Sequence, residues 1–217
     1  MIISRIDIYS LNVPFFKPLK IAIGAIEAAE NIAIKITTDT GLVGWGEASP
    51  CPYIVGDTQQ TAYQAAQPLA QLILGKDPLA IEARMTEING FIVGESSIRS
   101  AYDMALYDIA AKAANMPLYQ FLGGELNAAQ GSNQRLLRTD LTIGMQDSVE
   151  QTVAQAQAIL DQNFDAIKMK VGRSGLQDVA HVAAVRALAG SDVAIKSTVI
   201  KAGITPQLSP ISMLWHH

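Results

Sequence analysis

Apolar and polar residues alternate along the N-terminal part of the chain with a period of two, which predicts β-strands. The first predicted strand covers residues 2–13 and ends at Pro14. Residues 15–30 lack a regular pattern and are expected to form a loop. Two further strands, residues 31–38 and 42–48, are separated by a short turn. The expected arrangement is an antiparallel meander, because so short a connection joins neighbouring strands as a hairpin.

A helical period replaces the strand period after a second loop. Asp57 and Thr58 are of the residue types that cap helices, and a helix is expected from them to about Leu74. Two more helices are predicted over residues 81–92 and 96–115, followed by an apolar turn at residues 118–124. The longest is clearly amphipathic. Its expected buried residues recur at helical spacing: Ile98, Ala101, Ala105, Ile109 and Ala113.

Several residues in this part of the chain admit a structural or a chemical interpretation. Gly44 and Gly46 lie within a predicted strand, where glycines often mark the close approach of another backbone. Glu47 could be catalytic, but a hydrogen-bonded structural carboxylate is the safer interpretation. Asp103 and Asp108 on the long helix are expected to be solvated or capping carboxylates.

The pattern changes again after Gly124. Residues 127–133 are polar and predict a domain boundary. Beyond them strands and helices alternate at the spacing of parallel βα units. The expected strands are residues 139–143, 165–172 and from 193 onward, and the expected helices are residues 147–161 and 176–189. The predicted fold is an α+β domain to about residue 125, followed by the beginning of a βα repeat.

Composition narrows the class of protein. The chain has 217 residues, of which 49% are hydrophobic and 17% charged, so it can bury a core. Its net charge of -4, without a basic block, does not favour nucleic acid or an anionic membrane as a partner. The single Cys51 excludes an internal disulfide framework. No signal peptide and no membrane-spanning run is recognised, so a cytoplasmic protein is expected.

The strongest candidate chemistry is Lys168 and Lys170 in the strand at residues 165–172. Residues two apart in a strand point to the same face, so these side chains project together. Neighbouring cations lower each other's pKa, and a lysine with a lowered pKa can act as a base near neutral pH. The alternative is an exposed strand with two solvated lysines. Ile167, Met169 and Val171 are expected on the opposite face.

Four segments in order carry a resemblance to a known family. They are Gly41–Ala48, Ala101–Asp108, Pro117–Gly124 and Lys168–Gly172. At this spacing the chain resembles the enolase superfamily, in its muconate-lactonising and mandelate racemase-like subgroup, and among these the dipeptide epimerases of the L-Ala-D/L-Glu epimerase type. The resemblance implies a capping domain followed by a (β/α)₈ barrel, with the site at the carboxyl ends of the strands. Since a closed barrel needs about 250 residues, an incomplete barrel is expected here.

The same resemblance implies the chemistry. Members abstract a proton next to a carboxylate, and Mg²⁺ stabilises the enediolate that forms. Lys170 would then be the base on one face of the carbon, and Lys168 would support the carboxylate side. Thr142, near the end of the first barrel strand, matches a position that faces the substrate. Epimerisation also needs a lysine on the opposite face, which the family takes from a later strand.

The resemblance also points to the segments that select the substrate. They are the loops Ile21–Glu30 and Ser49–Gly56, with Gly24 and Ile54 as substrate-binding candidates. Epimerases acting on an acidic dipeptide typically carry a cation in the first loop, where this chain has Gly24 and no Lys or Arg. A neutral or hydrophobic dipeptide is therefore expected as the small-molecule substrate. Homo-oligomerisation stays open.

No metal ligand is recognised. By resemblance, an Asp, a Glu and an Asp should follow the third, fourth and fifth barrel strands, the first near residue 198 in an Asp-x-Asn-x-x-Trp pattern. The chain has Ser197–Gly203 there. One set of codons for these residues, with a single base added in front, reads Ile-Asp-Gly-Asn-Gln-Gly-Trp. We therefore expect a capping domain over 1–125, βα units over 126–196 and an out-of-frame tail over 197–217, which would make the chain truncated.

Competing interpretations follow from this conflict. The matched lysines favour a Mg²⁺-dependent epimerase by descent. The unmatched metal ligands favour a non-catalytic remnant or binding fragment. A third interpretation is another reaction on the same scaffold, such as o-succinylbenzoate synthesis or muconate cycloisomerisation, which also uses Lys-x-Lys.

Overall fold

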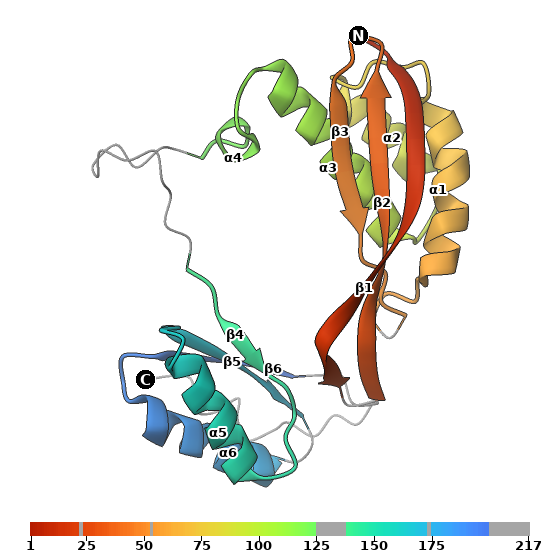
Figure 1. Cartoon of the computed structure of the whole chain (residues 1–217). Coiled ribbons are helices and arrows are strands. Elements are labelled where there is room, and N and C mark those ends of the chain that lie inside the picture. Colours follow the sequence, from red (N-terminus) through yellow and green to blue (C-terminus); the bar gives the residue numbers. More distant parts are fainter. Residues whose placement is uncertain (22–23, 53, 125–137, 173–174, 200–217) are drawn as a thin grey trace, which may run out of the picture. The chain divides into compact units, whose positions relative to one another are not determined.

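A computed structural model of the chain describes residues 1–21, 24–52, 54–124, 138–172 and 175–199. The chain divides into two compact units (Figure 1). The first comprises Met1–Phe15 and Ala28–Arg135, and the second comprises Phe16–Glu27 and Leu136–His217. Among the described residues no helix is both long enough and apolar enough to cross a membrane.

An N-terminal sheet has the strand order β1-β2-β3 (Figure 1). Its strands are β1 (Ile3–Ile21), β2 (Gly24–Thr38) and β3 (Val43–Ala48), and β2 and β3 are antiparallel. The expected loop over residues 15–30 is wrong, because β1 continues past Pro14 and β2 already begins at Gly24. A proline in an edge strand is tolerated because the missing N–H need not pair with a neighbour, and β1 is an edge strand.

The helices of the first unit begin and end close to the predicted residues. They are α1 (Gln59–Ile73), α2 (Ile81–Phe91), α3 (Ser96–Ala113) and the single turn α4 (Leu118–Phe121). The predicted cap of α1 is confirmed at Thr58, whose hydroxyl accepts a hydrogen bond from the backbone N–H of Thr61. The Thr61 hydroxyl in turn accepts from the backbone N–H of Thr58, which completes a capping box.

The core of the first unit lies between one face of the sheet and the helices (Figure 1). Three isoleucines of β2 line this face and have no exposed surface: Ile32, Ile34 and Ile36. The predicted buried residues of α3 are confirmed except for Ala113, which is exposed. The buried Tyr102 donates a hydrogen bond from its hydroxyl to the carbonyl of Ala66, 2.7 Å away, and so joins α3 to α1.

Gly44 and Gly46 allow α3 to approach β3 at backbone distance. A Cβ atom added to Gly44 would overlap the carbonyl oxygen of Ala105, and one added to Gly46 would overlap that of Ala101. The close backbone approach predicted from these glycines is confirmed. Any side chain at either position would push the helix away from the sheet, because buried atoms are already at packing distance.

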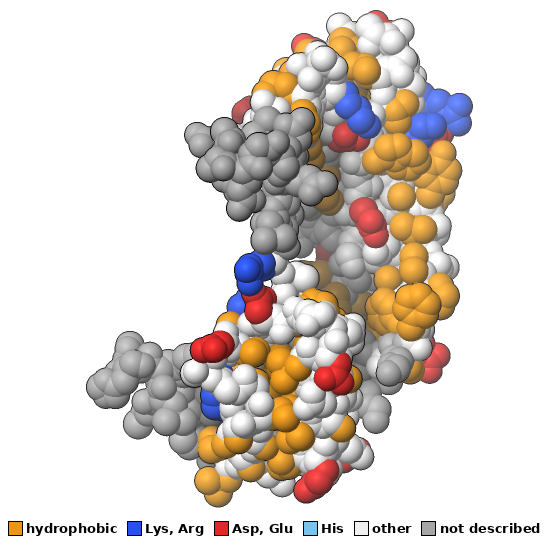
Figure 2. Space-filling model, turned by 60° about the vertical axis from the view of Figure 1, so that its left-hand side comes forward, with side chains coloured by type: hydrophobic (Ala, Val, Ile, Leu, Met, Phe, Trp, Pro, Cys, Tyr) orange, Lys and Arg blue, Asp and Glu red, His pale blue; other side chains and the backbone are white. Residues whose placement is uncertain are grey.

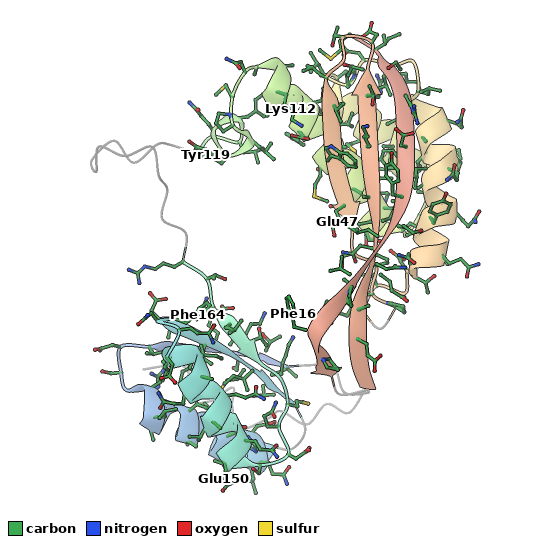
Figure 3. The ribbon with its side chains drawn as sticks, in the orientation of Figure 1. Phe16, Glu47, Lys112, Tyr119, Glu150 and Phe164 are labelled. Atoms are coloured by element: carbon green, nitrogen blue, oxygen red, sulfur yellow. The ribbon has the colours of Figure 1, made fainter. Side chains whose placement is uncertain are left out.

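Side chains of α3 also form hydrogen bonds with backbone groups at the outer edge of β3. The backbone N–H of Trp45 donates to a carboxylate oxygen of Asp108 at 2.9 Å. Lys112 projects from α3 toward β3 and donates to the carbonyl of Val43 at 2.7 Å (Figure 3). The two side chains also form an ion pair of 2.8 Å. We call Asp108 and Lys112 the edge lock, since strand edges otherwise present unpaired groups.

The outer face of this sheet is partly apolar. Trp45 is 48% exposed and Tyr9 44%, with ring centroids 6.1 Å apart. The Lys35 ammonium lies 5.6 Å from the Trp45 ring centroid, and Figure 2 shows hydrophobic side chains at the surface of this unit. Glu47 accepts a hydrogen bond from the Asn31 amide at 2.5 Å, as expected for a structural carboxylate.

The second unit is built on three parallel strands in the order β4-β5-β6 (Figure 1). The strands are β4 (Leu141–Ile143), β5 (Ala166–Val171) and β6 (Ala194–Val199), connected through α5 (Val149–Leu160) and α6 (Gly175–Ala189). These are the predicted βα units of an incomplete barrel.

A second core covers one face of this parallel sheet. It joins strand residues to residues of both helices: Ile143, Ala156, Ile159, Ile167, Met169, Val185 and Ile195. The polar residues 127–133, where a boundary was predicted, lie outside the described residues. Of the predicted tail, Ser197 to Val199 continue β6, and residues 200–217 lie outside the described residues.

Candidate functional site

Lys168 and Lys170 lie on the same face of β5, as predicted. Both are half-buried, whereas Ile167, Met169 and Val171 are buried on the opposite face against the helices. The alternation follows from the period of two along a strand. The apolar residues direct β5 into the core, and this direction holds the two lysines together on the other side.

The register of the parallel strands places polar residues beside the lysines. Thr142 of β4 and Lys196 of β6 are both opposite Lys168. Thr198 of β6 is opposite Lys170. Opposed residues of parallel strands project to the same side. With Asp140, which immediately precedes β4, these side chains form what we call the lysine face: Asp140, Thr142, Lys168, Lys170, Lys196 and Thr198.

One ion pair crosses the lysine face. The Lys196 ammonium lies 2.9 Å from a carboxylate oxygen of Asp140. Lys196 belongs to the outer strand β6, and Asp140 immediately precedes the other outer strand, β4. The hydrogen bond from Lys196 lowers the pKa of the Asp140 carboxyl, with additional Coulombic contributions from Lys196 and Lys168. Asp140 is therefore an anion at neutral pH.

A pocket of about 200 Å³ opens where β4 and β5 end. Its wall combines the loop after β4, the end of β5 and the first turns of α5 and α6, and includes Lys170, Thr152 and His181. The hydroxyl of the buried Thr152 is hydrogen-bonded to Nδ1 of His181 at 2.6 Å. The backbone N–H of Gly172 donates to Asp178 at 2.9 Å. The pocket thus lies at the carboxyl ends of the strands, where barrel enzymes carry their sites.

The predicted substrate-binding residues outside the lysine face are Gly24 and Ile54. Gly24 is the first residue of β2, and Ile54 is 83% exposed in a turn in which its N–H donates to the carbonyl of Cys51. Ile54 belongs to the first unit and the lysines to the second. The role of Gly24 and Ile54 in substrate selection stays a prediction.

The described residues do not fit a divalent cation. They contain no group of three or more His, Cys, Asp or Glu side chains that could hold a metal ion. Magnesium prefers carboxylate oxygens and bound water. On the lysine face the position expected to supply a carboxylate, near residue 198, carries a threonine, and Asp140 is already paired with Lys196.

Asp140 and Lys196 were not identified from the sequence. Both show the spacing of two residues that identified the lysines: Asp140 precedes Thr142 by two residues, and Lys196 precedes Thr198 by two. Their meeting depends on the register of three strands, however, and no single strand contains this information. The pairing of Thr152 with His181 joins two helices and was missed for the same reason.

Comparison with known proteins places these features in a family. Residues 5–123 match the model of the mandelate racemase / muconate lactonizing enzyme, N-terminal domain. The chain is 35% identical over 196 residues to the D-Ala-D/L-Ala epimerase of Cytophaga hutchinsonii, covering 90% of this chain and 51% of that protein. It is 36% identical to the L-Ala-D/L-Glu epimerase of Bacillus subtilis, covering 90% of this chain and 52% of that protein.

Solved structures of dipeptide epimerases superpose on this chain. A dipeptide epimerase from Cytophaga hutchinsonii, complexed with Mg and D-Ala-L-Val, superposes with a TM-score of 0.83 at 34% identity and covers 91% of this chain and 51% of that one. One from Enterococcus faecalis, complexed with Mg and L-Leu-L-Tyr, superposes with a TM-score of 0.83 at 30% identity and covers 91% and 53%. The chain spans about half the length of the relatives it matches.

Proposed function

Because the chain belongs to the mandelate racemase / muconate lactonizing enzyme family, we propose that its lysine face removes the proton next to the carboxylate of a dipeptide. The observation that carries the proposal is the placement of Lys168 and Lys170 on one face of β5, flanked by Thr142 and Thr198. The expected superfamily chemistry, proton transfer next to a carboxylate, matches such a pair. Two relatives that each cover 90% of this chain are a D-Ala-D/L-Ala epimerase and an L-Ala-D/L-Glu epimerase, which supports the substrate class.

The roles follow from position and charge. Lys168 is the residue that holds the substrate carboxylate, because it lies farther from the open ends of the strands and beside the Thr142 hydroxyl. Lys170 lies at the end of β5 and borders the pocket. In its neutral form its Nζ takes the proton from the α-carbon, and the electron pair of the broken C–H bond moves into the carboxylate to give an enediolate.

Return of a proton from Lys170 restores the original configuration and exchanges the hydrogen with solvent. Inversion needs a donor on the opposite side of the carbon, whereas Lys168 and Lys170 project from one side. The activity proposed for this chain is therefore exchange of the α-proton. The described residues do not fit a divalent cation, so this proposal rests on the lysines and threonines.

The substrate is proposed to be a neutral or hydrophobic dipeptide. Residues 21–30 contain no Lys or Arg to meet an acidic side chain, and Glu27 would repel one. Related proteins include a hydrophobic dipeptide epimerase from Enterococcus faecalis, 31% identical over 196 residues. No structural observation favours lyase or cycloisomerase chemistry over proton exchange.

Proton NMR in D₂O tests the proposal directly. The full chain is incubated with L-Leu-L-Ala, and loss of the α-proton signal of the C-terminal residue is followed. Lys170→Met should lower the exchange rate about 100-fold or more, since a positioned base contributes that much. Lys35→Met, which removes a lysine of the first unit, should leave the rate unchanged. Absence of exchange by the unaltered chain, or an undiminished rate in Lys170→Met, would overturn the proposal.

A further inference from the structure

The lysine face carries more positive than negative charge. Three ammonium groups, those of Lys168, Lys170 and Lys196, lie on it. Among the described residues of this face, Asp140 is the one carboxylate, and it is engaged by Lys196. Pairing removes one charge of each sign, and the half-buried Lys168 and Lys170 form no ion pair with a described residue, so the face keeps more positive than negative charge. The excess positive charge on the lysine face favours the binding of an anion, because opposite charges attract at short range.

Hydrogen-bonding capacity on this face points to an oxyanion. Neither Lys168 nor Lys170 makes a hydrogen bond or an ion pair to another described residue. Each lysine has a threonine hydroxyl opposite it on a neighbouring strand, Thr142 beside Lys168 and Thr198 beside Lys170. Ammonium groups and hydroxyls both donate, and a carboxylate accepts several hydrogen bonds at once.

The same features disfavour a divalent cation. A magnesium ion near the lysine face would be repelled by two ammonium groups, and the described residues of this face offer it no carboxylate except Asp140, which is paired with Lys196. Thr198 offers a neutral hydroxyl at the position where family resemblance leads one to expect the first acidic ligand. Two related epimerases were solved with Mg and a dipeptide.

We propose that the lysine face binds a carboxylate directly, through the ammonium groups of Lys168 and Lys170 and the two threonines, without a metal ion, and that Lys170 releases its proton before it acts as the base. This inference rests on the proposed function for the location of the site but not for its chemistry. It assigns the carboxylate to lysine ammonium groups instead of to Mg²⁺. It also makes binding sensitive to ionic strength, because the interaction depends on charges that salt screens.

NMR titration of the full chain labelled with ¹³C-lysine tests this assignment. The probe is N-acetyl-L-alanine, which has one carboxylate and no amine, added in EDTA at constant ionic strength. The Lys168 and Lys170 signals, assigned from variants, should shift saturably. N-acetyl-L-alaninamide, which lacks the carboxylate, should shift neither. Lys168→Met and Lys170→Met should each weaken binding about tenfold, as expected for a lost charge-assisted hydrogen bond, and Lys35→Met should not weaken it.

Charge-retaining variants separate binding from folding. Lys168→Arg and Lys170→Arg should keep binding within about threefold, because a guanidinium also binds carboxylates. Titrations without binding in EDTA, or binding that appears only on addition of Mg²⁺, would overturn the inference. Binding without exchange in D₂O would uphold the inference and overturn the proposed activity, so the two fail separately.

Discussion

Both units cover one face of a three-stranded sheet with helices, but they bring helix and sheet together in different ways. In the first unit α3 lies against β3 at backbone distance, through Gly44 and Gly46. In the second unit the contact runs through side chains, including Ile167 and Met169 of β5 and Val185 of α6. The first contact has no space for an added methyl group, whereas the second is an apolar layer of adaptable side chains.

This difference determines which substitutions each unit tolerates. Backbone-to-backbone packing cannot relax by a change of rotamer, so its geometry is set by the absence of side chains. An apolar layer can repack if its volume is kept. The edge lock of Asp108 and Lys112 adds to the rigidity of the first unit. The second unit leaves the opposite face of its sheet to the lysines.

Gly46→Ala should have the largest effect on stability. The new Cβ would overlap the Ala101 carbonyl, and a displacement of α3 should lower the free energy of unfolding by about 3 kcal/mol or more. The change in unfolding free energy is measured by urea unfolding followed by the fluorescence of Trp45. A Trp215→Phe background removes the second tryptophan of the chain. As a matched control, Gly90→Ala in α2 meets no atom within 4 Å and should raise stability by about 0.5–1 kcal/mol. Equal stability of the two variants would contradict the comparison.

Asp108→Ala should have an intermediate effect. It removes the acceptor of the Trp45 N–H and the partner of Lys112, and should lower the free energy of unfolding by about 1–2 kcal/mol in the same assay. Asp103→Ala, on the same helix, is the control. Burial, with Glu82 nearby, raises the pKa of the Asp103 carboxyl, so its removal should not destabilise. If both variants lost the same stability, the edge lock would have no specific role.

Met169→Leu should have a smaller effect. Met169 is 2% exposed in the core of the second unit, and a swap that conserves volume should change the free energy of unfolding by less than about 1.5 kcal/mol. Far-UV circular dichroism during urea unfolding measures the change. A loss as large as that of Gly46→Ala would show that the second unit is packed as rigidly as the first.

Glu95→Gln should have the smallest effect, and one that depends on pH. Burial, and secondarily Asp57, raise the pKa of the Glu95 carboxyl above its ordinary value, and its Oε2 has no hydrogen-bond partner among the described residues. The folded state thus favours protonated Glu95, so the stability it contributes at low pH is lost as pH rises through the folded pKa. Glu95→Gln should be more stable than the unaltered chain at pH 7, and the difference should disappear in acid. Parallel urea midpoints across the pH series would contradict this.

Local patterns were sufficient to predict most of the fold. The cap at Thr58, the buried positions of α3 and the close approach at Gly44 and Gly46 all depend on neighbours in one element or on the absence of a side chain. The loop expected after Pro14 was wrong because a proline ends a strand only where its missing N–H is needed. Whether it is needed depends on strand order, which is not encoded locally.

The candidate site divides in the same way. The shared face of Lys168 and Lys170 follows from the period of two and was predicted. The pairing of Asp140 with Lys196 and the edge lock of Asp108 were not, because each joins elements whose meeting depends on register and packing. Asp108 was expected to be solvated or capping its own helix, and it instead accepts a hydrogen bond from another element.

The edge lock has a consequence for how the protein is made. Its two hydrogen bonds join β3 to residues 63 and 69 positions later in the chain. During synthesis, β3 therefore leaves the ribosome with an open edge, which stays open until α3 has emerged and folded against it. A nascent chain paused in this interval would present a strand that a neighbouring nascent chain could pair with. Chaperone demand during translation should accordingly peak before Lys112 emerges and fall after it.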